Sequence, residues 1–179
     1  MRPSLPPQLM IMDACVLIDF IKADRVVLEL IVKHVGQLYV TASIVGEIHE
    51  IDDGSELIGL GINIIEPEIE DAYDAAGRSG PLSFSDWLCL LTAKRHGCTC
   101  VTNDKNLRKY CTRENIPLLW GLELITKLYH AGGITARDGE IIARRIGQLN
   151  PKHITENIIS DFVTRLRQQE KSGRDGRAD

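Results

Sequence analysis

The sequence lacks the features that define several classes of protein. No apolar stretch in its 179 residues continues long enough, without an interrupting charge, to cross a membrane. Residues 1–8 lack the pattern of a cleavable signal peptide. There is no internal repeat, and the segment GLGIN (59–63) lacks the following helix that a dinucleotide-binding loop needs. With 44% hydrophobic and 26% charged residues, the composition predicts a soluble globular protein rather than a disordered one.

Cysteine and histidine do not form a pattern typical of a metal site. The five cysteines are an odd set without secretory context, which predicts reduced thiols and a cytoplasmic protein. Cys98 and Cys100 would point the same way from one strand. No second cysteine or histidine pair stands at zinc spacing, so we expect both in the core. The histidines are scattered, and we expect His49, which lies near an acidic motif, at the surface.

The charged residues are unevenly distributed. The net charge of −4 argues against extensive coating of nucleic acid, but local clusters matter more than the sum. Residues 47–74 contain ten acidic side chains and no lysine or arginine, whereas residues 94–113 contain six basic side chains and one acid, Asp104. A solvated helix face is the simplest interpretation of the acidic segment. The basic segment surrounds a short apolar strand that ends at the same Asp104.

Short apolar segments alternate with helical patterns over the first two thirds of the chain. Strands of four or five apolar residues separated by helices predict a parallel sheet covered on both faces. The predicted strands are 8–12, 37–41, 62–65, 99–102 and 116–120. The predicted helices are 15–23, 25–36 with Gly36 as a stop, one from Ser43, one behind Pro67 to Gly77, 85–96 before Gly97, and a short basic helix. We expect an α/β fold, a three-layer α/β/α sandwich with a short parallel sheet.

After Gly121 the pattern becomes wholly helical. The expected helices are 121–131, 135–149 behind a Thr135-x-x-Asp138 capping box, and 154–169. This organisation predicts a first domain over 1–120, a C-terminal helical extension over 121–169 packed on the same domain, and a disordered tail over 170–179.

Four acidic residues fall at one edge of the predicted sheet. Asp13 follows the first strand, Glu47 lies about one turn into the helix after the second, and Asp104 follows the fourth. From Asp86 a helix descends about ten residues, roughly 15 Å. About five strand residues then climb the same distance back. Asp86 and Asp104 therefore return to the same level, at the carboxyl edge where open parallel sheets bind ligands.

Each acid also has a purely structural interpretation. Asp13 and Asp104 could cap helices, Ser83-x-x-Asp86 is a possible capping box, and Glu47 could be an exposed helix residue. Caps have no reason to cluster, however. Neighbouring carboxylates raise each other's pKa values unless a cation lies between them, and oxygen-only ligands favour Mg²⁺ or Mn²⁺. The hypothesis is metal-assisted attack of water on a phosphodiester.

The same segments resemble the four motifs of PIN-domain ribonucleases. They are MIMDACVLIDFI, the glutamate of TASIVGEI, SFSDWLCLLTAKRHGC and CVTNDKNL, and the resemblance covers about residues 8–120. It implies a PIN-like fold and an Mg²⁺ or Mn²⁺ pocket. Asp13, Glu47, Asp86 and Asp104 would be its catalytic residues and metal ligands, and the hydroxyl of Thr102 would support it.

The resemblance also implies RNA as substrate. Many small PIN proteins are toxins of type II toxin–antitoxin pairs, so an antitoxin partner is expected. The helices after Gly121 exceed a minimal PIN toxin and could form a dimer or partner surface or fill out the core; we expect a homodimer. We expect Arg95, Lys105, Arg108 and Lys109 to bind RNA phosphates. Cys15 stands where the family more often has Ser, Thr or Asn.

Three further hypotheses remain at this stage. Trp87 could stack on a base, although an aromatic on an amphipathic helix is more often a core residue. A phosphoacceptor domain would also have an acidic Mg²⁺ pocket, but it needs an aspartate ending the third strand and a lysine ending the fifth. Here those strands end in Glu66-Pro67 and Trp120-Gly121. A PIN-like scaffold that binds RNA or a protein without cutting is the alternative that sequence does not exclude.

Overall fold

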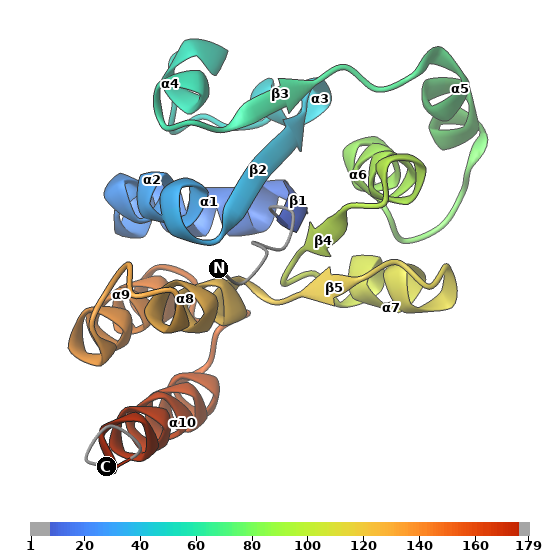
Figure 1. Ribbon diagram of the computed structural model, residues 1–179. Coiled ribbons are helices and arrows are strands. Elements are labelled where there is room, and N and C mark those ends of the chain that lie inside the picture. Colours follow the sequence, from blue (N-terminus) through green and yellow to red (C-terminus); the bar gives the residue numbers. More distant parts are fainter. Residues whose placement is uncertain (1–7, 176–179) are drawn as a thin grey trace, which may run out of the picture.

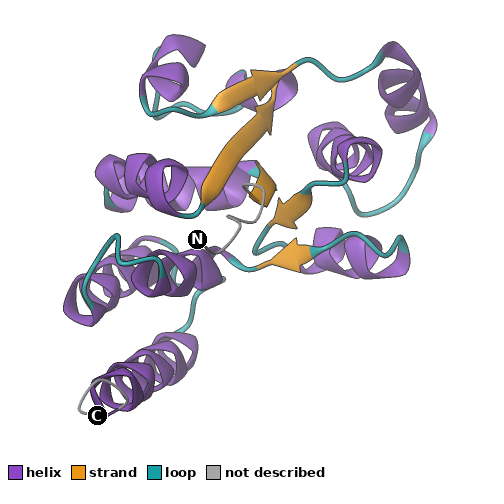
Figure 2. Cartoon of the chain, in the orientation of Figure 1, coloured by secondary structure: helices purple, strands orange, loops and turns teal. Residues whose placement is uncertain are grey.

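Five parallel strands form the sheet at the centre of the protein (Figures 1 and 2). The structure is a computed structural model and describes residues 8–175. The strand order is β3-β2-β1-β4-β5. The strands are β1 (Gln8–Met12), β2 (Gly36–Thr41), β3 (Asn63–Ile65), β4 (Thr99–Val101) and β5 (Leu118–Leu119). The predicted α/β fold with a short parallel sheet is confirmed.

The central strand β1 alternates its side chains between two cores. Met10 and Met12 face one core together with Val40 of β2, whereas Ile11 faces the other together with Cys100 of β4. All five side chains are fully buried. This alternation is the two-residue period of a strand whose faces are both covered.

Helices cover both faces of the sheet, as Figure 1 shows. The first core includes side chains of α1, α2, α8, α9 and α10, and the second those of α5, α6 and α7. The helices are α1 (Ala14–Ala23), α2 (Arg25–His34), α3 (Ala42–Val45), α4 (Gly54–Gly59), α5 (Ile69–Gly77), α6 (Phe84–His96), α7 (Lys105–Arg113), α8 (Gly121–His130), α9 (Ala136–Leu149) and α10 (Glu156–Asp175).

Three local predictions differ from the structure. Gly36 is not a helix stop but the first residue of β2, and a Cβ there would lie 2.4 Å from the carbonyl oxygen of Gln8. The helix α3 spans only four residues and begins before Ser43, so Glu47 lies in the turn that follows it. The short helix α4 was not predicted; the side chain of Asp53 caps it by accepting a hydrogen bond from the Ser55 amide.

The three C-terminal helices belong to the same core as the sheet. Helix α8 contacts α2, α9 contacts α1, and α10 packs on α9. Helix α10 continues to Asp175, so residues 170–175 of the predicted disordered tail are helical, and residues 176–179 lie outside the described residues. The apolar side chains Phe162, Val163 and Leu166 anchor this helix. Over residues 8–175, no helix is long and apolar enough to cross a membrane.

Candidate active site

Asp13 lies at the carboxyl end of the central strand, beside the end of β4. Its amide donates to the carbonyl of Val101, 3.0 Å away, which continues the ladder between β1 and β4 by one residue. The next residue along that strand, Thr102, donates its hydroxyl to Oδ2 of Asp13 at 2.7 Å. The thiol of Cys15 donates to the same oxygen at 2.9 Å. Asp13 is only 4% exposed, so the sheet places a nearly buried carboxyl group at the predicted edge.

The surroundings of Asp13 disfavour its charge. Burial raises the pKa of the carboxyl group, the hydrogen bonds from Cys15 and Thr102 oppose this rise, and the negative charge of Asp86 adds to it. Burial and the charge of Asp13 also raise the pKa of the Cys15 thiol, which keeps it protonated and able to donate. Cys15 therefore makes, through sulfur, the hydrogen bond to Asp13 that a hydroxyl at this position could make.

Asp104 caps α7 and is tied to Asp13 through Thr102. Oδ1 of Asp104 accepts a hydrogen bond from the Leu107 amide at 2.7 Å. Its own amide donates to the Thr102 hydroxyl at 2.9 Å. The Thr102 hydroxyl thus accepts from one acidic residue and donates to the other. The role of this hydroxyl in supporting a metal pocket, which the resemblance implies, stays a prediction.

Two residues at the beginning of α6, Ser85 and Asp86, hold candidate site groups. Oδ2 of Asp86 accepts from the Ser83 amide at 2.8 Å, and the Ser83 hydroxyl accepts from the Asp86 amide, so the predicted capping box is present. The hydroxyl of Ser85 donates to Oε1 of Glu47. Sequence reasoning missed Ser85 because a serine beside an acidic motif carries no signal of a partner 38 positions away.

Capping and metal binding are compatible roles for these acids. The hydrogen bonds found among the described residues use only one oxygen of each carboxylate: Oδ2 of Asp13, Oε1 of Glu47, Oδ2 of Asp86 and Oδ1 of Asp104. Within residues 8–175, no three Asp, Glu, His or Cys side chains converge as a ready-made metal cluster. An oxygen-only donor set, and a carboxyl group whose pKa is raised by burial and by the charge of Asp86, would nevertheless suit a hard cation.

The predicted basic residues occupy two different places. Lys105 and Lys109 are exposed on α7, directly behind Asp104, and the Arg108 guanidinium lies 3.6 Å from the ring centre of Trp120. Arg95 lies nine residues after Asp86, near the other end of α6, and its guanidinium donates two hydrogen bonds of 2.7 Å to Asp71. Three of the four predicted basic residues therefore lie on the first turns of α7, the helix that begins directly after Asp104. Arg95 does not lie there.

Trp87 is a core residue, which is the more frequent location of an aromatic side chain on an amphipathic helix. It is 3% exposed, and its ring packs edge-on against Tyr110 with centroids 4.8 Å apart. Base stacking on Trp87 therefore finds no support in the structure.

A second polar network, which the sequence did not indicate, supports the loop between Thr102 and Asp104. The Asn103 side chain accepts from the Gly121 amide at 3.0 Å and donates to Asp19 at 3.3 Å. Asn150, at the end of α9, donates to the same Asp19 carboxylate. The C-terminal helices are thereby hydrogen-bonded to the loop that carries two of the candidate site residues.

The structure is an α/β domain with a parallel sheet, and Asp13 and Asp104 follow two adjacent strands at its carboxyl edge. A family model described as PIN domain matches residues 10–112, more than half of the chain, and the chain belongs to this family. A comparison with curated proteins gave no match. PIN domains are generally nucleases that act on nucleic acids with the help of divalent metal ions. All four acids lie within the matched residues, whereas Trp120 and α8–α10 lie outside them.

Proposed function

We propose that the protein is a metal-dependent endoribonuclease that hydrolyses phosphodiester bonds of RNA. The observation that carries this proposal is the nearly buried Asp13, which is linked to Asp104 through Thr102 and lies in the field of Asp86. A structural role alone gives no reason to hold a carboxyl group where burial and a like charge both raise its pKa. Such perturbed groups are typical of functional sites.

The chain's own residues would prepare the site for one or two ions. Asp13, Glu47, Asp86 and Asp104 would hold Mg²⁺ or Mn²⁺ through the oxygens that their hydrogen bonds leave open. When bound, the metal supplies Lewis-acid activation of water and neutralises charge on the phosphoryl group. Thr102 and Cys15 fix the orientation of Asp13, Ser85 that of Glu47, and the Leu107 amide that of Asp104. No histidine base is required by this chemistry.

Cleavage should depend on added metal and leave 5′-phosphate and 3′-hydroxyl ends. An activated water in line with the leaving 3′ oxygen produces these ends, whereas attack by the RNA's own 2′-hydroxyl produces a cyclic phosphate. The test incubates labelled single-stranded RNA with the purified protein in Mg²⁺, Mn²⁺ or EDTA and determines the fragment ends. Cleavage that persists in EDTA would contradict the mechanism. Metal binding without cleavage of any RNA would favour the alternative, a non-catalytic scaffold that binds RNA or a protein partner.

The exposed lysines of α7 should bind RNA phosphates beside the site. Changing Lys105 or Lys109 to glutamate should weaken binding to all RNA sequences and lower the slope of log K against log salt by about 0.7 for each lost contact. Lys33→Glu is the matched control, since Lys33 is exposed at the end of α2, at the opposite edge of the sheet. If the salt-dependence slope is the same for all three variants and the wild type, Lys105 and Lys109 do not contact RNA and belong to an ordinary solvated helix face.

We extend the proposal to the biological setting that the family resemblance implies. The protein would be the toxin of a type II toxin–antitoxin pair in the cytoplasm, controlled by an antitoxin that fills the acidic pocket, and it would form a homodimer. The open carboxyl edge and the exposed side chains of Ile69 and Tyr73 on α5 are compatible with protein partners. Light scattering measures the dimer, and a neighbouring reading frame that suppresses toxicity on co-expression would identify the antitoxin.

A further inference from the structure

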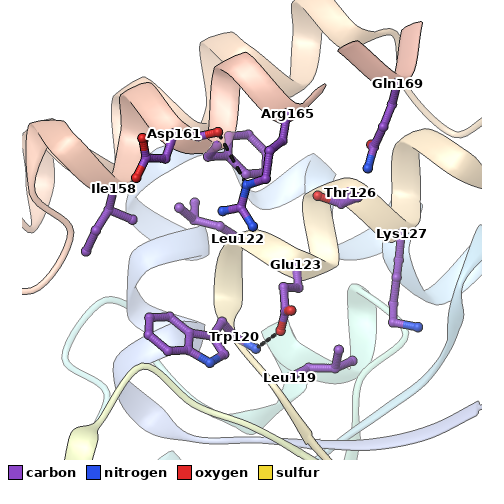
Figure 3. A pocket seen from close by; sticks show the side chains of 11 residues that line it. Leu119, Trp120, Leu122, Glu123, Thr126, Lys127, Ile158, Asp161, Arg165 and Gln169 are labelled. Atoms are coloured by element: carbon purple, nitrogen blue, oxygen red, sulfur yellow. Dashed lines mark hydrogen bonds between the residues drawn. The ribbon is translucent and has the colours of Figure 1, made fainter. Parts of the chain in front are cut away.

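A groove that the proposed reaction does not use lies between α8 and α10. It encloses a cavity of about 520 Å³ and begins at Trp120, the residue that follows β5. Figure 3 shows Trp120, Glu123 and Arg165 around this space, with Arg165 reaching down from α10. The groove is formed by the C-terminal helices, outside the part of the chain that matches the family model. Its ligand therefore cannot be inferred from family membership.

The pairing of β4 with β5 brings the groove next to the acidic site. Val101 is in register with Leu119, and the Thr102 amide donates to the Leu119 carbonyl at 3.1 Å. The residue directly before Trp120 is therefore hydrogen-bonded to the backbone of Thr102, whose hydroxyl binds Asp13. From the other side, Arg108 on the first turns of α7 places its guanidinium over the Trp120 indole. The arginine–tryptophan stack joins the acidic site to the groove.

The Trp120 ring has surface that is open to a ligand. The Trp120 side chain is 42% exposed although it lies against a guanidinium and at the wall of a cavity. Nη1 of Arg108 is buried and has no hydrogen-bond partner among the described residues. A buried donor without an acceptor is destabilising, and a large exposed aromatic surface is a typical recognition element. The exposed indole surface beside the cavity suits a ligand that offers a flat aromatic face.

We propose that the Trp120 groove binds an unpaired nucleobase of the RNA strand whose phosphodiester lies at the acidic site. The base would stack on the face of the Trp120 indole that Arg108 leaves open, and Arg108 would hold the indole from the other face. This inference rests on the proposed nuclease function and adds to it a base-binding subsite outside the residues that match the family model. The base must be unpaired, because only an unstacked base can offer its face to the indole. Lys127 and Arg165 along the groove are balanced by Glu123 and Asp161, so the groove is not a general phosphate channel.

Tryptophan fluorescence tests this proposal without any cleavage. Trp87 is buried and Trp120 exposed, so a stacked base should quench the signal of Trp120 alone. The probe is a ten-nucleotide oligoadenylate titrated into the full chain in EDTA. We expect quenching in the wild type, none in Trp120→Phe, and binding about tenfold weaker in Trp120→Ala, with Trp120→Phe nearer to the wild type because its ring still stacks. An RNA duplex of the same length should quench much less.

The outcomes separate this inference from the nuclease proposal. One outcome is that the oligoadenylate quenches Trp120 and binds Trp120→Ala about tenfold more weakly, while no RNA is cleaved with metal. This would support the groove proposal and overturn the nuclease proposal. If the wild type cleaves RNA but Trp120→Ala binds the oligoadenylate with unchanged affinity, the groove proposal is overturned and the nuclease proposal stands. A change in Trp120 fluorescence with protein concentration alone would also overturn it, since the groove would then be an interface between copies. Circular dichroism of Trp120→Ala establishes that the variant is folded.

Discussion

Replacing Asp13 with asparagine is expected to abolish RNA cleavage while leaving the metal-free protein folded. The variant removes a carboxylate that we place on the metal, and metal stabilisation of the transition state is worth several kcal/mol. At 1.36 kcal/mol per tenfold change in rate, the loss should be roughly a thousandfold or more. Oδ1 of the asparagine can still accept from Thr102 and Cys15, so local packing should be retained.

The stability of the same variant should depend on pH in a defined direction. The pKa of Asp13 is raised by burial above its ordinary value of 3.8. An acid whose pKa is higher in the folded than in the unfolded protein contributes stability below pH 3.8 and loses that contribution as pH rises through the folded-state pKa. In EDTA, the free energy of unfolding of the wild type should therefore fall as the pH rises from 3.8 to the folded-state pKa of Asp13. Asp13→Asn should lack this fall and exceed the wild type at neutral pH by on the order of 1 kcal/mol.

Added metal should make the wild type more stable than Asp13→Asn, the reverse of the order expected in EDTA. A ligand that binds only the folded state raises its stability, so Mg²⁺ or Mn²⁺ should raise the melting temperature of the wild type and not that of Asp13→Asn. Glu29→Gln is the control, because Glu29 is exposed on α2 and its substitution makes the same change in charge. A folded Asp13→Asn variant that cleaves at more than one tenth of the wild-type rate would exclude Asp13 from the reaction.

The places of three of these acids in the secondary structure could be predicted because they depend on local sequence pattern. Asp13 and Asp104 follow apolar strands, and Asp86 stands three residues after a serine cap, so each had a signal within a few residues. The structure confirms the strands and the capping box. The hydrogen bonds through Thr102 give a physical link between Asp13 and Asp104. Ligation of a metal by these acids stays a prediction.

The features that sequence could not supply are contacts between distant segments. Glu47 was expected within a helix, yet α3 ends two residues earlier and Ser85 of α6 holds the carboxylate instead. The stack of Arg108 on Trp120 depends on how α7 lies against the end of β5. No local periodicity encodes such pairs, because the distance between the side chains is set only when the sheet and both helices have assembled.

Removing residues 121–179 is expected to prevent the remaining chain from folding cooperatively. The extension supplies part of the core that covers α1 and α2, and it closes the Asn103–Asp19–Asn150 network. Its buried apolar side chains are Leu122, Leu124, Ile125, Leu128, Ala136, Ile142, Ala143, Ile146, Ile154, Ile159, Phe162, Val163 and Leu166. A fully buried large apolar side chain is worth about 1.5–3 kcal/mol. Even the fraction of this set that faces α1 and α2 is comparable with the roughly 5–15 kcal/mol by which a domain is stable.

A graded set of truncations tests this expectation. A chain that ends at Asn150 keeps α8 and α9, the helices in contact with α2 and α1, and loses only α10, which packs on α9. It should unfold cooperatively in urea at a lower midpoint than the full chain. The chain that ends at Trp120 should instead bind a hydrophobic dye and show no cooperative transition, because the apolar faces of α1 and α2 are then exposed to water. If residues 1–120 unfold cooperatively and cleave RNA, the first 120 residues are an independent domain, and the C-terminal helices serve the substrate or a partner rather than the fold.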